Sequence, residues 1–168
     1  MKIVIVSDIH DNLVNLDKCL SWCKKQNIES IICCGDIANS ETLEKFSAGF
    51  SGKIYLVKGN MEIYDEDELK RHKNIKYFGQ IGNFTLNKIK IGACHEPFLI
   101  DKVIESGDKD IIFYGHTHKP WIDQRQTRGG RKIKVVNPGT LGGVFQKATF
   151  AFWDINNQQL ELKILEKL

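Results

Sequence analysis

The sequence lacks the features typical of membrane, secreted and nucleic-acid-binding proteins. No apolar run approaches the roughly 20 residues that a membrane-spanning helix needs. The short run Ile3–Val6 after Lys2 is also too brief for the apolar segment of a signal peptide. The 24 basic and 21 acidic residues leave a net charge of only +3, spread along the chain, so the charge pattern contains no nucleic-acid footprint. We therefore expect a cytoplasmic protein that binds neither membranes nor nucleic acids.

The five cysteines form neither a disulfide pattern nor a zinc-binding pattern. They stand at positions 19, 23, 33, 34 and 94, an odd number with no Cys-x-x-Cys spacing. Three of them lie within apolar runs, which is typical of buried free thiols in a reducing compartment. The chain also lacks internal repeats, low-complexity runs and linkers. With 168 residues available for one core, we expect a single domain over residues 1–168.

Five apolar runs typical of buried strands end in side chains that can bind a metal ion. Taken singly, such a residue is more often a helix cap or an ordinary hydrogen-bonded side chain. The histidines favour a site, because four of the five in the chain stand at such ends. The carboxyl ends of strands are also where open α/β sheets collect ligands. The candidate residues are Asp8, His10, Asp36, Asn60, His95, His116 and His118.

These seven side chains offer imidazole nitrogen together with carboxylate and amide oxygen, and no thiolate. One small ion cannot use seven donors. Two ions a few ångströms apart can do so if one carboxylate bridges them, and Asp36 in the middle of the set is the natural bridge. The mixture favours Mn²⁺, with Ni²⁺, Fe, Co²⁺ or Zn²⁺ as alternatives, over Ca²⁺ or a structural zinc. Two such ions can activate a shared hydroxide that attacks phosphorus.

The pattern of apolar residues predicts alternating strands and helices early in the chain and mainly strands later. Strands are expected over residues 2–7, 28–34 and 53–58, with helices that begin near residues 13 and 40, so the first two strands should be parallel. Residues 61–73 are a loop or weak helix. Further strands are expected over 75–78, 84–86 and 88–94, and a helix over 97–106. After residue 118, the segments 120–124, 132–136, 148–154 and 159–165 predict an antiparallel meander.

The order and spacing of the candidate residues resemble those of the calcineurin-like metallophosphoesterases. The motifs that carry the resemblance are Asp8-Ile-His10, Gly35-Asp36, Gly59-Asn60, His95 and Gly115-His116-Thr-His118. The short length and the segment Asn137-Pro-Gly-Thr140 resemble the small bacterial and archaeal phosphodiesterase branch, which also includes the retromer subunit of that fold. The resemblance implies an α/β protein, a four-layer α/β/β/α sandwich with two mixed sheets and a metal site at the carboxyl edge of the strands.

The resemblance also implies roles for the seven residues. One metal would be held by Asp8, His10, Asp36 and His118, and the other by Asp36, Asn60, His95 and His116. Among them, His10, Asp36, Asn60 and His95 would be the catalytic positions. The implied activity is hydrolysis of a small phosphoester substrate, most often a diester, by a hydroxide that bridges the ions. The alternative is a catalytically weak interaction module of the same fold, which predicts a large apolar patch away from the pocket.

Two positions depart from the family pattern. Many members have Gly-Asn-His-Glu, whose histidine is thought to protonate the leaving group, whereas this chain has Met61 at that place. Met61 cannot donate a proton, which would slow the loss of a poor leaving group by about 10²- to 10⁴-fold. Members of the small branch that this chain resembles often lack the histidine too and are regarded as phosphodiesterases, so the resemblance favours diesters over monoesters. His95 lacks the usual flanking glycine. Glu96 either orients His95 or is a surface residue before a helix that starts with proline.

Substrate specificity is expected in the loops around the metal edge, chiefly residues 61–73 and 121–131. The second loop is either a solvated hairpin tip or a clamp for a further phosphate, and Asn137-Pro-Gly139 is either a plain turn or a contact to the site. The aromatic residues Trp121, Phe152 and Trp153 would pack in the core or in a subunit contact of a homo-oligomer. The basic residues of the second loop are Arg125, Arg128, Arg131 and Lys132.

Overall fold

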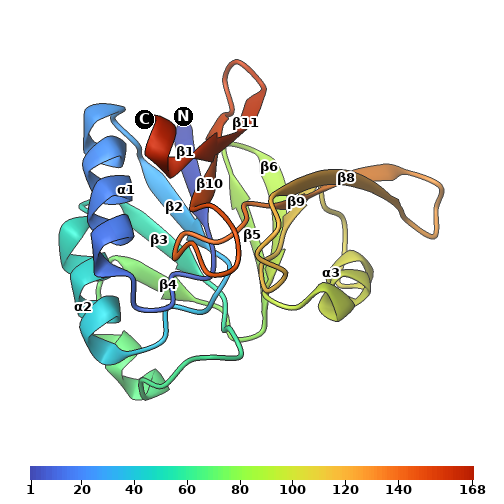
Figure 1. Ribbon diagram of the computed structural model, residues 1–168. Coiled ribbons are helices and arrows are strands. Elements are labelled where there is room, and N and C mark those ends of the chain that lie inside the picture. Colours follow the sequence, from blue (N-terminus) through green and yellow to red (C-terminus); the bar gives the residue numbers. More distant parts are fainter.

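Two β-sheets packed face to face form the centre of the protein, in a computed structural model that describes residues 1–168 (Figure 1). The first sheet has six strands and the second has five. In chain order the elements are β1 (Lys2–Val6), α1 (Leu13–Lys25), β2 (Ser30–Cys33), α2 (Ser40–Gly49), β3 (Lys53–Leu56), η1 (Glu66–Arg71), β4 (Ile75–Tyr77), β5 (Ile81–Leu86), β6 (Ile89–Cys94), η2 (Pro97–Leu99), α3 (Ile100–Glu105), β7 (Ile111–Phe113), β8 (Trp121–Gln126), β9 (Lys132–Asn137), β10 (Thr149–Asp154), β11 (Gln159–Ile164) and η3 (Leu165–Lys167).

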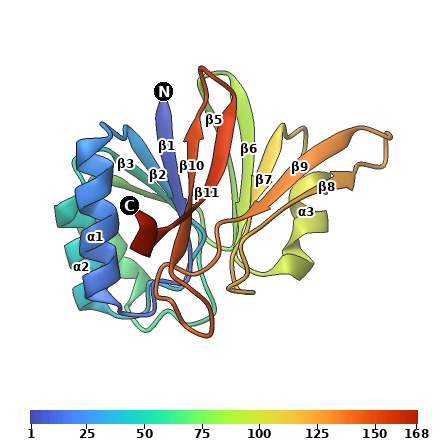
Figure 2. The same cartoon turned by 45° about the horizontal axis from the view of Figure 1, so that its top comes forward.

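The four layers follow from which faces of the two sheets are apolar. The six-stranded sheet has the order β11-β10-β1-β2-β3-β4, and the five-stranded sheet has the order β5-β6-β7-β9-β8. Helices α1 and α2 cover the outer face of the first sheet, whereas α3 covers the outer face of the second (Figures 1 and 2). The predicted four-layer α/β/β/α sandwich with two mixed sheets is therefore confirmed.

Strand β1 shows how the sequence produces this layering. Successive side chains of a strand point to opposite faces, so neighbouring residues enter different parts of the core. Val4 and Val6 pack among the side chains of α1 and α2. Ile3 and Ile5 pack between the two sheets. Because both faces are covered, the strand reads as a continuous apolar run without the alternation of a half-exposed strand.

The four strands predicted after residue 118 all form, and they pair antiparallel as β8 with β9 and β10 with β11, but the two pairs lie in different sheets and make no continuous meander. Strand β7 pairs in parallel with both β6 and β9, so it is a central strand of the second sheet. Strands β10 and β11 cross to the first sheet, where Lys2 of β1 lies opposite Asp154 of β10. The apolar stretch of β10 is buried at nearly every position, as expected for an interior strand with a neighbour on each side. Its partner lies about as far away along the chain as possible, which local periodicity cannot indicate.

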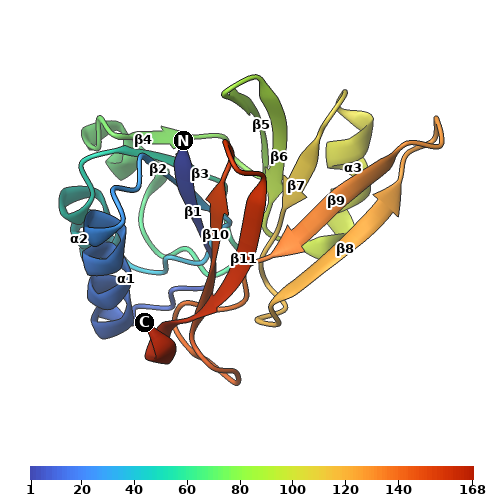
Figure 3. The same ribbon diagram turned by 90° about the horizontal axis from the view of Figure 1, so that it is seen from above.

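The parallel strands bring two sets of strand ends to one side of the molecule. Strands β1, β2 and β3 run parallel in the first sheet, and β6, β7 and β9 run parallel in the second. Seen from above, the two sheets lie side by side with the β8–β9 hairpin extending outward (Figure 3).

No helix combines the length and the apolar character that crossing a membrane would require.

The packing between the sheets predicts a large effect for Phe113. Its side chain is fully buried between the sheets, with its ring centroid 5.7 Å from that of Trp153. We expect Phe113→Ala to lower the free energy of unfolding by about 3–5 kcal/mol, because it leaves a cavity that the sheets cannot fill. The exposed Phe98 is the matched control. Phe98→Ala should change the free energy of unfolding by less than about 0.5 kcal/mol. Urea unfolding measures both, and equal losses would contradict the assigned packing.

Candidate metal centre

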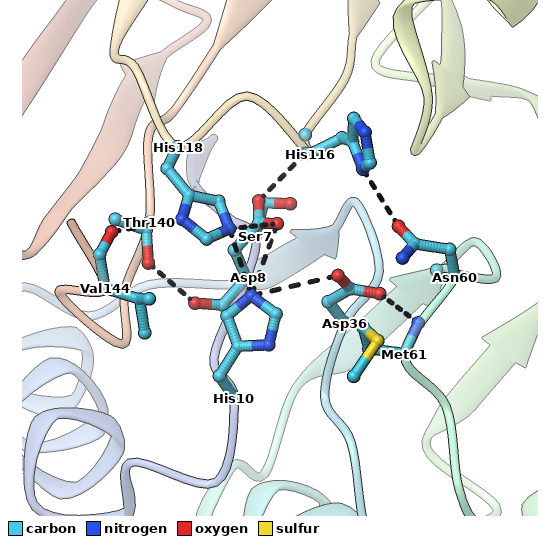
Figure 4. A network of polar contacts seen from close by, with 12 residues as sticks. Ser7, Asp8, His10, Asp36, Asn60, Met61, His116, His118, Thr140 and Val144 are labelled. Carbon is cyan, nitrogen blue, oxygen red and sulfur yellow. Dashed lines mark hydrogen bonds and ion pairs between the residues drawn. The ribbon is translucent and has the colours of Figure 1, made fainter. Parts of the chain in front are cut away.

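All seven predicted side chains meet at the edge where the carboxyl ends of the two sheets come together. Figure 4 shows Asp8, His10, Asp36, Asn60, His116 and His118 there. The first sheet contributes the residues after β1, β2 and β3, and the second contributes those after β6 and β7. The short contacts described below link every one of them into a single cluster. The sequence-based grouping of these residues is therefore reproduced by the geometry, whereas the role of each as a metal ligand is a separate question.

The buried carboxylate of Asp8 faces two imidazole rings. Its Oδ1 atom lies 3.2 Å from Nε2 of His118 and 3.7 Å from Nε2 of His10, and those two nitrogens are 3.0 Å apart. The other oxygen, Oδ2, accepts a hydrogen bond from the backbone N–H of His116 at 3.0 Å. Oδ1 is buried and has no hydrogen-bond partner. A buried carboxylate oxygen without a donor is costly, and a cation would relieve that cost.

Asp36 lies between this first cluster and a second one. Its Oδ2 atom is 3.8 Å from Nε2 of His10 and 3.3 Å from Nε2 of His95, so the same oxygen faces both sides. Beyond His95, Oδ1 of Asn60 lies 2.8 Å from Nε2 of His95 and 2.9 Å from Nδ1 of His116. One carboxylate oxygen thus stands at the junction of two groups of nitrogen and oxygen donors.

Backbone carbonyls orient two of the rings. Nδ1 of His95 donates to the carbonyl of Cys34 at 2.7 Å, and Nδ1 of His118 donates to the carbonyl of Val144 at 3.0 Å. Each ring therefore carries its proton on Nδ1 and directs the lone pair of Nε2 toward the carboxylates, as metal-binding histidines usually do. The carbonyl of Cys34 orients His95, and Glu96 makes no side-chain bond to it, which favours the surface alternative for Glu96.

The pKa shifts of Asp36, His10 and His95 all favour the charged forms of these side chains. Burial raises the pKa of Asp36, but the hydrogen bond and charge of His95, with the amide of Met61 and the charge of His10, lower the pKa below its ordinary value. The contact with the Asp8 carboxylate is the largest cause that raises the pKa of His10, and the charge of Asp36 adds to it. Burial would lower the pKa of His95, yet Asp36 and Asp8 raise it above the ordinary value. The lowered pKa keeps Asp36 negative, which attracts protons or cations to the neighbouring rings.

These observations fit a metal site. Two sets of side chains have donor atoms within 4.8 Å of one another, Asp8 with His10 and His118, and Asp8 with Asp36 and His95. Two imidazole nitrogens in contact beside an unpartnered carboxylate oxygen form a grouping that a shared cation stabilises. The donors are oxygen and imidazole nitrogen, which suit the divalent ions of the later first transition row and Mn²⁺.

The backbone of the site is held in an unusual conformation. Five of the seven residues have a positive φ, between 46° and 68°, in the region that residues other than glycine seldom adopt. Such strain persists only where the surroundings enforce it. Gly59 is one cause of the tight packing, because a Cβ atom there would lie 2.1 Å from Oδ1 of Asp36. The five residues are Asp8, His10, Asp36, His116 and His118.

Glu62 holds two of the site loops together, a role that the sequence did not reveal. Its carboxylate accepts hydrogen bonds from the backbone N–H groups of Asp36, Ile37, Ala38 and Gly59, at 2.9 to 3.2 Å. Burial raises the pKa of Glu62, and the amides of Ala38, Gly59 and Ile37 offset part of that rise. These bonds fix the backbone that carries Asp36 against the turn that carries Asn60. The pairing of one carboxylate with the amides of a loop 24 to 26 residues away leaves no trace in local sequence.

The segment Asn137-Pro-Gly-Thr140 supports the site from beneath. The amide of Asn137 donates to the carbonyl of Gly115 at 2.8 Å and to the hydroxyl of Thr117 at 3.0 Å, within the Gly-His-Thr-His loop. The hydroxyl of Thr140 donates to the carbonyl of Asp8 at 2.9 Å. Neither side chain joins the metal cluster. The segment is both a turn and a brace for the loops that carry the cluster.

The basic loop lies away from the site, so the clamp alternative is wrong. Strand β8 begins at the site edge, since Trp121 pairs with Asn137 at the carboxyl end of β9, and it then runs to the opposite edge. The tip beyond β8 packs near α3, where Arg128 pairs with Glu105 and Arg131 bonds the carbonyl of Lys109. The loop is a surface hairpin tip. Of the two expected specificity segments, residues 61–73 begin at the metal edge, whereas 121–131 touch it only through Trp121.

A metal-capable cluster at the carboxyl edge of two facing sheets is the arrangement of a metallohydrolase. The profile of the Calcineurin-like phosphoesterase superfamily domain matches residues 1–158. The chain therefore belongs to the calcineurin-like phosphoesterase superfamily. Members of that superfamily hydrolyse phosphoester bonds with divalent metal ions, and the donor set described above accords with that chemistry.

Relatives of similar size support the assignment. The chain is 30% identical over 149 residues to Phosphodiesterase MJ0936 of Methanocaldococcus jannaschii, covering 85% of this chain and 86% of the relative. It is 24% identical over 154 residues to Phosphodiesterase YfcE of Escherichia coli, covering 84% and 79%. A solved structure described as a novel archaeal phosphodiesterase superposes with a TM-score of 0.83 at 24% identity, covering 98% of this chain and 99% of the other, and so supports the fold.

The hydrogen bonds of Glu62 give a test of the loop geometry. Glu62→Gln keeps the shape of the side chain but turns an –NH₂ group toward backbone N–H donors, so at least one amide loses its acceptor. We expect the free energy of unfolding to fall by about 1–3 kcal/mol. Thermal unfolding of the metal-free protein measures this loss. Glu41→Gln, an exposed change in the first turn of α2, is the control and should have little effect. Equal stability of the two variants would contradict the role assigned to Glu62.

Proposed function

We propose that the chain is a dinuclear metal-dependent phosphodiesterase. The observation that carries the proposal is the position of Oδ2 of Asp36, which faces His10 on one side and His95 on the other. A single carboxylate between two donor groups suits two ions that share it. The unpartnered Oδ1 of Asp8 supports a cation in the first group.

The proposed ligand sets follow the two groups of contacts. The first ion would lie among Asp8, His10, Asp36 and His118, and the second among Asp36, Asn60, His95 and His116. We propose Mn²⁺ as the physiological ion, with Ni²⁺, Fe, Co²⁺ or Zn²⁺ as alternatives, because the donors are imidazole nitrogen and carboxylate or amide oxygen.

The chain's own residues would bind and orient the phosphoester. When bound, the two ions would neutralise charge on the phosphoryl oxygens and lower the pKa of an attacking water. The carbonyls of Cys34 and Val144 keep the Nε2 atoms of His95 and His118 directed into the site, so no rotation is needed before binding. Met61 uses its backbone N–H to hold Oδ1 of Asp36 at 2.8 Å, which leaves Oδ2 free to face both groups.

The substrate class follows from the group that is missing at position 61. The Met61 side chain supplies no proton for a leaving oxygen, so the leaving group must depart with little help from an acid. A diester, whose phosphorus carries a single negative charge, suits such a site better than a monoester dianion. The names of the two relatives, both phosphodiesterases, agree with this choice. We also propose that the chain works as one domain over residues 1–168 in a reducing compartment such as the cytoplasm, in keeping with its five buried free cysteines.

Activity with a defined pair of substrates tests the proposal. Protein reconstituted with Mn²⁺ or Ni²⁺ should hydrolyse bis(4-nitrophenyl) phosphate faster than 4-nitrophenyl phosphate, as measured by release of nitrophenolate. The two substrates share a leaving group, so the ratio isolates the diester preference. Metal-free protein in chelator is the control. Inactivity with every divalent ion, in protein that binds metal and remains folded, would favour the non-catalytic interaction module.

The shared carboxylate predicts different losses in two variants. We expect Asp36→Ala to abolish hydrolysis and to lose both ions, whereas Asn60→Ala should mainly weaken the second. Metal content per chain, measured by mass spectrometry of elements after desalting, gives the readout. Asp101→Ala, an exposed change in α3, should retain both ions. Two ions retained in a folded Asp36→Ala protein would contradict the bridging role.

A further inference from the structure

Large apolar side chains are exposed around the metal edge more than elsewhere. Eight such residues stand on the surface of the whole molecule. Six of them stand in segments that follow strands ending at this edge, or at the first residue of a strand that begins there. Three lie in loops, and the other three lie in α1, η2 and β8. Exposed apolar residues gathered on one face indicate a binding surface more strongly than scattered ones do. The six residues are Val14, Met61, Ile63, Phe98, Trp121 and Phe145.

Phe145 is the most exposed of these residues and the one with a direct contact to the cluster. Its side chain is 92% exposed, and its ring lies nearly parallel to that of His118, with an interplanar angle of 22° and centroids 6.2 Å apart. The preceding residue, Val144, supplies the carbonyl that orients His118. The loop that positions a proposed metal ligand therefore also presents a flat apolar ring beside it.

The backbone at Phe145 is held in a conformation that a bulky residue rarely adopts. Its φ is +60°, in the left-handed region that favours glycine or asparagine. The conformation costs energy, and it exposes the ring to water without burying it in the core. Stability of the fold gives no reason for this arrangement. A ligand that covers the ring does.

The metal edge carries a lysine, Lys119 directly after His118, whereas three of the chain's arginines lie away from it. Recognition of a second phosphate usually relies on the planar fork of arginine. The chain has only four arginines. Arg125, Arg128 and Arg131 lie on or beyond the half of β8 far from the site, and Arg71 is at the end of η1. The loops that follow the metal-edge strands thus offer rings and aliphatic chains in place of arginine forks.

We propose that Phe145 determines specificity by stacking on an aromatic or other flat apolar ester group of the substrate. This inference rests on the proposed phosphodiesterase activity and narrows it to diesters that carry at least one such group. The phosphate would lie at the metal cluster, and the ester group would extend over the ring of Phe145. Offset stacking of two rings adds to the burial of apolar surface, so the contact contributes mainly to binding.

Kinetics with two diesters test the contact. The substrates are bis(4-nitrophenyl) phosphate and ethyl 4-nitrophenyl phosphate, which release the same leaving group. Phe145→Ala should raise KM for the first about 3- to 10-fold with kcat and metal content unchanged. If Phe145 contacts the ester group that remains on phosphorus, KM for the ethyl ester should change little. If Phe145 contacts the leaving ring, KM should rise by the same factor for both substrates. Phe145→Tyr, which keeps the ring, should retain the KM of the wild type.

Binding without turnover separates this inference from the proposed activity. Phenylphosphonate and ethylphosphonate carry a ring or an alkyl group on phosphorus through a carbon–phosphorus bond, which the enzyme cannot hydrolyse. Isothermal titration calorimetry of the Mn²⁺-loaded protein compares the affinities of the two compounds. The wild type should bind the phenyl compound more tightly, and Phe145→Ala should lose that preference. Gln146→Ala, an exposed change in the same loop, should retain it.

The outcomes of the two experiments are distinct. No preference for phenylphosphonate in the wild type, or a preference and KM unchanged in Phe145→Ala, overturns the role of Phe145. A preference that depends on Phe145 in a protein that hydrolyses neither diester supports ring binding and contradicts the proposed activity. Loss of the preference in Gln146→Ala as well would assign the effect to the loop as a whole and overturn the role of the ring.

Discussion

The structure depends on holding electron-rich atoms together at one edge of the sheets, around the buried Asp8, Asp36 and His95. Carboxylate oxygens and imidazole lone pairs converge at the metal edge, and in the absence of a cation they repel one another. Backbone hydrogen bonds keep them there, through Glu62 on one side and the carbonyls of Cys34 and Val144 on the other. The left-handed backbone at the strand ends is a result of the same demand. The sandwich of sheets supplies a rigid support that makes such crowding possible.

Much of the fold and of the cluster could be predicted because it is encoded in short sequence patterns. An apolar run that ends in a polar residue marks a strand and its carboxyl end, so Asp8, Asp36 and His116 could be assigned to one edge before any contact was known. The pairing of β10 with β1 could not, since its partners lie at opposite ends of the chain. Long-range strand order is decided by which runs are buried on both faces, and β10 resembles β7 in that respect.

The residues that support the site were harder to predict than those that form it. A metal-capable side chain is recognisable by its chemistry, whereas Glu62 and Asn137 act on backbone groups of distant loops. Their value depends on where those loops pass, which is a property of the assembled fold. The same holds for Phe145, whose sequence neighbourhood suggests an ordinary turn. Its exposure and its position beside His118 are visible only in three dimensions.

The two sheets contribute different side chains to the cluster, and this division would link metal binding to the integrity of the sandwich. Asp8 and Asp36 extend from the first sheet, and His95 and His118 from the second, so an ion shared between them is a cross-link across the layer boundary. Such an ion binds the folded arrangement and has no equivalent in the unfolded chain. By mass action, the free energy of unfolding then rises with the logarithm of free metal concentration. The concentration of free metal in the cell would thus set the stability of the contact between the two sheets, independently of any reaction at the site.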